Sequence, residues 1–440
     1  MKYDKFFEKA KEVGIDALEL SITKSTKFSF SLFKNEIDSY SIADSFRLSA
    51  RGIFDGKMGY ASSEKIDSTT VDYIIEHIKE NATLNTSDDK PFIFPGSSKY
   101  HKKNVYNKEL DQTSANDKIS LVKQLDARVK NLDSRIQEAE TSYEEETEEY
   151  SLLNSYGLKL SSKQNYAVVY SSAVATDELG ETKNGYEVKI LTSLSDLNIE
   201  ELANKVVKNT IDQFKSGPCK SGKYKCVFNP KSTSQLLSFF LQSISSEEVQ
   251  KNTSLLKGKL NQEVCSKKLT ITESPLKNNV FFRYFDDEGV ATSNKTLIKN
   301  GVLQTYLYNL TTANKDGVET TGNGYKNGSG IGIRAVNVQI KPSKVTEEEL
   351  FKKVKDGIYI TGISGLHSGM NSQSGNFSLI SQGFMIRDGK LEEPISLITV
   401  AGNLFEVFNN VACVANNLEL QTNSYEVPSI FVRSIQVSGK

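Results

Sequence analysis

The sequence contains only three histidines, His77, His101 and His367, and this scarcity limits the chemistry that the chain can perform. No two of them lie within one helical turn of each other, and there is no His-Glu-x-x-His motif. A hydrolytic zinc site needs three side-chain ligands and a carboxylate that takes a proton from bound water. The sequence therefore predicts that this chain does not build the usual hydrolytic zinc centre.

His367 is followed directly by Ser368, which suggests a base beside a nucleophile. The surrounding residues do not form the G-x-S-x-G turn of serine hydrolases, and adjacent residues on a strand point to opposite faces. The segment is rich in Gly, Ser and Asn. His367 is either a ligand contact or a hydrogen-bonding residue of a loop.

Two glycine-rich segments could bind phosphate or a ligand backbone. Gly217–Lys223 matches G-x-x-x-x-G-K, but Tyr224 stands where a P-loop needs Ser or Thr, and a helix precedes the segment instead of following it. We interpret it as a linker. Gly322–Gly332 does not fit nucleotide-binding spacing. It is either a mobile loop that closes over an extended ligand or a simple surface loop.

Acidic and sulfur side chains offer a second set of candidates. Asp286, Asp287 and Glu288 precede Gly289, so this segment is either a tight turn or a site for a hard cation. The four cysteines have no spacing typical of zinc and are too few for a disulfide scaffold. They are predicted to be independent thiols: Cys219, Cys226, Cys265 and Cys413.

Apolar periodicity predicts the helices and strands that position these residues. Helices are expected at 199–214, at 232–245 and at 347–355, where Thr346 and Glu349 form a capping box and Gly357 ends the helix. Asp55-Gly56 predicts a hairpin turn. The fold class is α+β, with an N-terminal α/β domain of antiparallel strands and helices (1–216) and a β-rich C-terminal domain (217–440).

Composition excludes several functional classes. The 440 residues are 38% apolar and 25% charged, which supports real hydrophobic cores. A net charge of −1 offers no basic excess for nucleic acid or for an anionic membrane surface. No apolar run approaches the ~18 residues of a membrane-spanning helix. The charged N-terminus lacks the apolar region of a signal peptide, so we expect a cytoplasmic protein.

Several ordered segments carry a family resemblance. In the second half these are Phe285–Thr292 (FDDEGVAT), Thr296–Asn309, Glu319–Gly324 (ETTGNG), Gly365–Leu379 (GLHSGMNSQSGNFSL), Gly383–Leu391 and Ile398–Leu404. Arg51–Ser63 (RGIFDGKMGYASS) adds a match in the first half. The chain as a whole resembles the TldD/PmbA family of cytoplasmic proteins, also described as modulators of DNA gyrase, and specifically its PmbA (TldE) branch.

The resemblance has consequences for metal binding. The TldD branch consists of zinc metalloproteases with a His-Glu-x-x-x-His helix and a later cysteine ligand. In this chain Ser238, Phe239 and Ser243 occupy the positions of the two histidines and the glutamate, and no cysteine follows Cys413, which lies too early to fit. The resemblance thus implies that this chain is non-catalytic and holds no cofactor, and that the zinc belongs to a catalytic partner.

The family also implies partners. We expect pairing with a TldD-type catalytic subunit or with a second copy, in a dimer that acts on small unfolded peptides. Such a peptide could be held as an added β-strand. The candidate peptide contacts are Gly322, Gly324, Gly330, Gly365, His367 and Asn371.

Two alternatives stay open. One is an active homo-oligomeric metallopeptidase with ligands drawn from scattered residues such as His367, Asp286 and Glu288. The other is a peptide-binding scaffold that has no protease partner. Metal content distinguishes the first alternative, and co-purification of a protease distinguishes the second.

Overall fold

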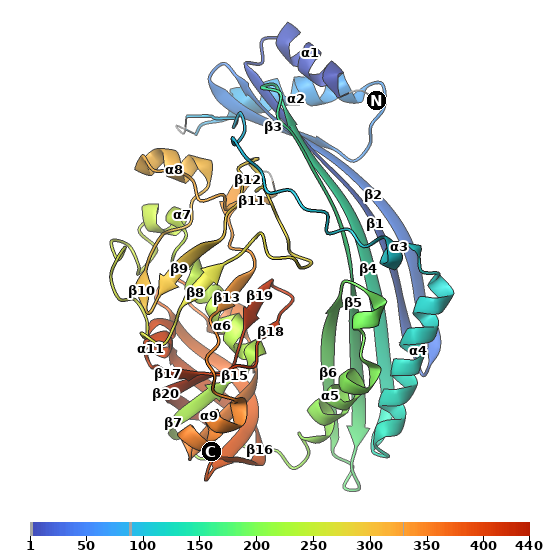
Figure 1. Ribbon diagram of the computed structural model, residues 1–440, viewed down its shortest axis with the longest axis vertical. Coiled ribbons are helices and arrows are strands. Elements are labelled where there is room, and N and C mark those ends of the chain that lie inside the picture. Colours follow the sequence, from blue (N-terminus) through green and yellow to red (C-terminus); the bar gives the residue numbers. More distant parts are fainter. Residues whose placement is uncertain (1–2, 88–89, 329) are drawn as a thin grey trace. The chain divides into compact units, whose positions relative to one another are not determined.

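The computed structural model describes residues 3–87, 90–328 and 330–440, which form two compact units (Figure 1). Unit 1 contains the chain up to Ile211 and two later segments, Asn278–Ala291 and Gly324–Ile331. Unit 2 contains Asp212–Lys277, Thr292–Asn323 and Gly332–Lys440. Both units combine helices with mostly antiparallel strands, which confirms the predicted α+β class.

Unit 1 is built on one antiparallel sheet with the order β3-β2-β1-β4-β5-β6. Its strands are β1 (Ala17–Phe33), β2 (Glu36–Phe54), β3 (Lys57–Ser63), β4 (Ile136–Asn154), β5 (Lys159–Thr176) and β6 (Thr182–Leu191). The turn between β2 and β3 has positive φ at Asp55 and Gly56, as the predicted Asp-Gly hairpin requires. The sheet is therefore a run of long hairpins, with β3 pairing only the last part of β2.

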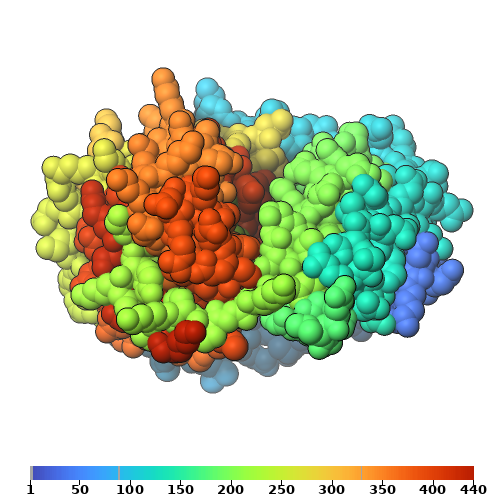
Figure 2. Space-filling model, turned by 90° about the horizontal axis from the view of Figure 1, so that it is seen from below, coloured from blue at the N-terminus to red at the C-terminus, as the bar shows by residue number. Residues whose placement is uncertain are grey.

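Helices cover the two ends of this sheet. They are α1 (Asp4–Glu12), α2 (Thr70–Leu84), α3 (Lys108–Gln112), α4 (Ala115–Leu132), the short η1 (Leu194–Asp196) and α5 (Ile199–Ile211). Ile74 and Ile78 of α2 are buried in one cluster with Leu18 and Leu20 of β1. At the other end α4 and α5 lie side by side (Figures 1 and 2). α5 ends at Ile211, three residues before the predicted Phe214.

Unit 2 contains a sheet with the order β16-β15-β14-β7-β20-β17. The strands are β7 (Gly222–Phe228), β14 (Gly357–Ser364), β15 (Asn376–Arg387), β16 (Lys390–Asn403), β17 (Val411–Val414) and β20 (Ile430–Ser438). An additional pairing of β16 with β20 joins β16, β15, β14, β7 and β20 into a closed ring of five strands. β7 begins at Gly222, inside the segment Gly217–Lys223, and no described helix begins there, as the linker interpretation requires.

A second sheet of unit 2 has the order β10-β9-β8-β13-β19-β18. Its short strands are β8 (Ile271–Glu273), β9 (Lys295–Lys299), β10 (Val302–Leu303), β13 (Val338–Ile340), β18 (Glu419–Leu420) and β19 (Tyr425–Val427). The helices are α6 (Pro230–Gln242), α7 (Ser246–Gln250), α8 (Leu310–Asp316), α9 (Glu347–Val354), α10 (Leu366–Gly369) and α11 (Leu404–Asn409). One hydrophobic core joins α6 and both sheets.

The ends of α9 show one prediction confirmed and one corrected. Thr346 and Glu349 form the predicted capping box. The helix does not end at Gly357, which begins β14; Lys355 takes the positive φ of 63° after the last helical residue. Glycine is needed at 357 for a different reason, because a Cβ there would lie 2.4 Å from the carbonyl oxygen of Lys225. None of the described helices is long and apolar enough to cross a membrane.

Candidate functional site

The helix that the resemblance aligns with the metal-binding helix of the TldD branch is α6 (Pro230–Gln242). Its N-cap Asn229 accepts a hydrogen bond from the backbone of Ser232 at 2.8 Å, and Pro230 occupies the first turn. Leu237 and Phe240 place its apolar stripe in the core of unit 2. The helix therefore forms where the sequence predicts it, with bounds Pro230–Gln242 in place of 232–245.

The three aligned side chains, two in α6 and one at its C-cap, are hydrogen-bonded, packed or buried. The Ser238 hydroxyl donates to the carbonyl of Gln235 in its own helix at 2.7 Å. Phe239 packs against the core, and Ser243 is the buried C-cap residue. Two hydroxyls and a phenyl ring supply neither the nitrogen or thiolate ligands nor the carboxylate base of a hydrolytic zinc site. The residues present do not fit zinc.

The cysteines do not replace the missing ligands. All four are free, and Cys219, Cys226 and Cys265 are buried. Burial raises the pKa of Cys265 to about 12 and raises the pKa of Cys226 further, so these thiols resist forming the thiolate that binds metal. Within the described ranges there is no group of three His, Cys, Asp or Glu residues that could hold a metal ion.

The glycine-rich segment is a β-hairpin, which corrects the expectation of a loop. Gly324–Asn327 forms β11 and Gly330–Ile333 forms β12, and the two pair as a small sheet. Ser329 lies outside the described residues. Sequence reasoning missed the hairpin because its glycines have no strand propensity of their own.

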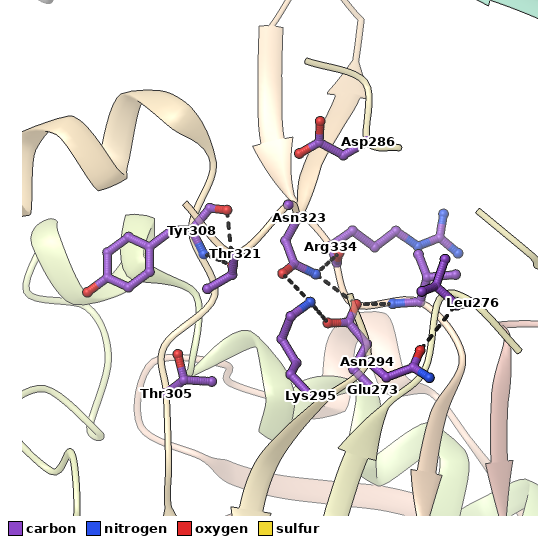
Figure 3. Close-up of polar contacts among 12 residues, drawn as sticks. Glu273, Leu276, Asp286, Asn294, Lys295, Thr305, Tyr308, Thr321, Asn323 and Arg334 are labelled. Atoms are coloured by element: carbon purple, nitrogen blue, oxygen red, sulfur yellow. Dashed lines mark hydrogen bonds and ion pairs between the residues drawn. The ribbon is translucent and has the colours of Figure 1, made fainter. Parts of the chain in front are cut away.

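The chain leading into and out of this hairpin is fixed in unit 2 by a buried polar cluster (Figure 3). Glu273 accepts from Lys295 Nζ at 2.8 Å, from Asn323 Nδ2 at 2.7 Å and from the backbone of Val336 at 2.8 Å. Asn323 also donates to the carbonyl of Arg334 at 3.0 Å. One carboxylate thus ties together the residues on both sides of β11 and β12.

The acidic segment Asp286–Gly289 forms a tight turn, which is one of the two interpretations given for it above. Gly289 donates its N–H to the Asp286 carbonyl at 3.0 Å and has a φ of +80°. Asp286 is buried, and its carboxylate accepts from the backbone of Glu288, Val290 and Gly324. Burial raises its pKa to about 6, although Arg283 and the three hydrogen bonds oppose that rise.

Gly324 packs against this turn. A Cβ at Gly324 would lie 2.7 Å from Glu288 Oε2 and 3.0 Å from Asp286 Oδ2. The position therefore needs glycine for internal packing. Gly330 is different: it is exposed, and its nearest neighbour would be the Asn327 carbonyl at 3.8 Å.

The segment around His367 is an exposed loop that is anchored by apolar residues. Leu366 and Met370 pack against the core of unit 2, while His367 lies exposed on α10. The Asn371 carboxamide oxygen accepts from the backbone of Gln373 at 3.1 Å and of Ser374 at 2.9 Å, which forms an Asx turn. The loop presents the His367 imidazole to solvent on a fixed base.

The predicted peptide contacts fall into separate groups. Gly322, Gly365, His367 and Asn371 belong to unit 2. The other two glycines of the set, in β11 and β12, belong to unit 1. Their role in binding a peptide stays a prediction, as does that of the scattered metal ligands, which are likewise divided between the units.

The structure also contains a polar cavity that sequence reasoning did not locate. It lies within unit 1 and its walls include Glu19, Arg51 and Lys326. His77 is an exposed residue at this cavity, and its ring lies against Tyr73 with ring centroids 4.1 Å apart. His101 is also exposed.

Comparisons with known proteins identify relatives of the chain. Family models of the PmbA/TldA metallopeptidases match residues 18–82 (domain 1), 108–214 (central domain) and 221–439 (C-terminal domain). The metalloprotease PmbA of Escherichia coli O157:H7 is 24% identical over 444 residues, which is 97% of this chain and 93% of the relative.

Two solved structures share the fold. A Thermotoga maritima protein assigned as a modulator of DNA gyrase is 30% identical, with a TM-score of 0.90 over 99% of both chains. TldE from Thermococcus kodakarensis is 24% identical, with a TM-score of 0.91 over 99% of both chains. The second likeness concerns the fold alone.

Proposed function

This chain belongs to the PmbA/TldD metallopeptidase family, and we propose that it is a peptide-binding, non-catalytic subunit that works with a TldD-type catalytic chain. The observation that carries this proposal is α6, the helix on which catalytic members place their zinc ligands. Here the aligned residues are Ser238, whose hydroxyl bonds within the helix, Phe239, which packs against the core, and the buried C-cap residue Ser243. With two metal ligands and the general base replaced, this helix lacks the groups that activate water in the catalytic members.

Peptide binding in this proposal uses the exposed loop of unit 2. A substrate held in an extended conformation contributes backbone hydrogen bonds, which give affinity with little sequence preference. His367 supplies a polar side chain on a base held by Leu366 and Met370. This suits a subunit that accepts flexible peptides of varied sequence in the cytoplasm.

Zinc stoichiometry tests the non-catalytic part of the proposal. The purified chain is treated with a mild chelator, dialysed and measured by elemental analysis. We expect well below one zinc per chain and no cleavage of an unstructured peptide. A stable equivalent of zinc, together with cleavage that a stronger chelator abolishes, would overturn the proposal in favour of an active homo-oligomer.

Reconstitution tests the partnership. The chain is mixed with a TldD-type protein, and peptide cleavage is measured for each protein alone and for the mixture. We expect the mixture to exceed the catalytic chain alone. His367→Ala should lower the rate in the mixture, and His101→Ala, an exposed histidine of unit 1, is the matched control. An unchanged rate with His367→Ala removes His367 from the peptide site.

A further inference from the structure

A cavity of about 390 Å³ lies entirely within unit 1. The sheet contributes Glu19 and Ser21 from β1, Arg47 and Arg51 from β2, and Tyr60 from β3 to its walls. The remaining wall comes from α2 and from the two later segments of unit 1. This volume is in the range of small-molecule sites.

A buried ion pair forms one wall of the cavity. Arg51 Nε donates to Glu19 Oε1 at 2.7 Å, and both residues are more than nine-tenths buried. Burial opposes the charge on Arg51, but attraction to Glu19 and Glu288 outweighs burial and raises its pKa, so the guanidinium stays charged.

This ion pair is incompletely satisfied. Within the described chain, Arg51 Nη2 and Glu19 Oε2 have no hydrogen-bond partner, although both atoms are shielded from solvent. A buried polar atom without a partner costs roughly 1–3 kcal/mol. The two unpaired atoms belong to residues that line the cavity, and the pair places a fixed, charged guanidinium behind its wall.

Lys326 brings a second cation to the cavity. Its Nζ donates to Ser21 Oγ at 2.5 Å, and no carboxylate of the described ranges lies within ion-pair distance of it. Burial lowers its pKa, with Asp287 partly opposing that change. Asp287 is already engaged, because its carboxylate pairs with Arg283 and accepts from the Lys326 backbone at 2.6 Å. The Lys326 ammonium is therefore partly desolvated without a paired anion.

The charges of the walls define the charge of the ligand. Arg47, Arg51 and Lys326 are positive, and Glu19 and Asp287 are negative, so one positive charge is left over. A monoanion balances this excess. A phosphate dianion would exceed it and would face the two carboxylates, which repel it.

The uncharged walls define the rest of the ligand. Tyr60, Tyr73 and Ile331 offer aromatic and aliphatic surface for an apolar body. Ser49, Ser62 and Asn81 offer polar groups that can pair with an amide.

We propose that this cavity binds a small monocarboxylate that carries an amide N–H and an apolar body, the chemistry shared by an N-acyl amino acid and the C-terminal end of a peptide. The carboxylate is held by Lys326 and Arg47, with the Arg51 guanidinium behind it. The site uses neither α6 nor the His367 loop. It therefore stands or falls independently of the non-catalytic role proposed above.

Calorimetric titration of the full-length chain with N-acetyl-L-phenylalanine tests the charge requirement. We expect saturable binding of this acid. Its uncharged amide and the dianion phenyl phosphate should bind at least about tenfold more weakly, which corresponds to ~1.4 kcal/mol. Equal binding of acid and amide, tighter binding of phenyl phosphate, or no binding of the acid would each overturn the proposal.

Two variants locate the binding in the cavity. Lys326→Met should lower affinity for the acid at least about tenfold, and Lys102→Met, which changes an exposed lysine of the same unit, should leave it unchanged. If Lys326→Met fails to fold, Arg47→Gln at an exposed strand position replaces it. Unchanged affinity in a folded Lys326→Met or Arg47→Gln variant would overturn the assignment.

Two further probes identify the source of the carboxylate. The tripeptide Ala-Ala-Phe and its C-terminal amide are titrated under the same conditions. Binding of the tripeptide acid at least as tight as N-acetyl-L-phenylalanine supports peptide ends as the natural ligand. Exclusion of the tripeptide, with the N-acyl amino acid still bound, supports a free small acid.

Discussion

At the scale of single residues, the buried charged side chains of this chain differ in how completely they are hydrogen-bonded. Glu273 is fully satisfied by Lys295, Asn323 and the Val336 backbone, so it acts as a clamp. The Arg51–Glu19 pair keeps one hydrogen bond and leaves Arg51 Nη2 and Glu19 Oε2 unpaired, and both residues line a cavity. Full hydrogen bonding indicates a structural role, and an incompletely bonded buried pair calls for another explanation.

Glu273→Gln should destabilise unit 2 by about 3 kcal/mol or more, because it leaves the Lys295 ammonium buried without its counter-charge. Glu263→Gln is the control, since Glu263 pairs with Lys267 on the exposed surface, where such pairs contribute roughly 0–1 kcal/mol. Urea unfolding of both variants checks the difference. Equal free energies of unfolding in the two variants would show that the clamp adds nothing.

Asp286 makes stability depend on pH. Its folded-state pKa of about 6 lies above the ordinary value of 3.8, so the folded chain holds this proton more tightly than the unfolded chain does. Its contribution to stability is therefore present at low pH and is lost as pH rises through about 6, by an amount on the order of 2–3 kcal/mol.

Asp286→Asn removes this titration. The free energy of unfolding of the wild type, relative to the variant, should fall between about pH 4 and pH 7. Urea titrations across this range measure it. Asp38→Asn, the same substitution at an exposed position of β2, is measured alongside it as the control. A flat difference for Asp286→Asn would mean that the carboxyl titrates normally.

At the scale of elements, local sequence patterns predicted the positions of the amphipathic helices. They did not predict the full length of the long strands. The apolar stripe of α6 and the capping box of α9 are local signals, and both elements appear where they were expected. Residues 36–45 of β2 are exposed on both faces and carry no alternating pattern. They form a strand because they pair in register with β1, which is a contact that only the fold supplies.

The hairpin of β11 and β12 shows the same limit. Its glycines suggested a loop, but Asn323 and Arg334 are held by hydrogen bonds, and Gly324 fits against two carboxylates. The cavity was missed for a related reason. Arg51 and Lys326 are far apart in sequence and meet only because the later segments return to unit 1.

Gly324→Ala should destabilise the chain by roughly 1–3 kcal/mol, because its Cβ would overlap the Glu288 and Asp286 carboxylates. Gly330→Ala, in the same hairpin, has open space around it and should be within about 0.5 kcal/mol of the wild type. Thermal unfolding compares the two. A Gly330→Ala variant as destabilised as Gly324→Ala would point to backbone conformation in place of packing.

At the scale of the whole molecule, the chain does not divide at a single point. The main transition at Ile211 lies close to the predicted boundary after 216, but Asn278–Ala291 and Gly324–Ile331 return to unit 1. Phe285 stacks on Tyr150, and the Tyr100 hydroxyl donates to the Gly289 carbonyl at 2.6 Å. These contacts make the returning segments part of the core and cavity of unit 1.

A fragment of residues 1–211 should therefore be much less stable than unit 1 of the full chain. Without the returning segments it loses the ring of Phe285 against Tyr150 and the Tyr284 hydroxyl bond to the Ser161 carbonyl at 2.6 Å. Loss of one buried aromatic side chain alone costs about 3–5 kcal/mol. Hydrogen exchange of β4 and β5 amides measures the difference between fragment and full chain.

A synthetic peptide with the sequence of residues 278–291 gives this comparison its control. If the returning segments supply the missing packing, the peptide should slow amide exchange in β4 and β5 of the fragment, since a ligand that binds only the folded state stabilises it. The same peptide with Phe285→Ala should protect less, because it lacks the ring that stacks on Tyr150. Native protection in the fragment alone would show that the first 211 residues complete their own core.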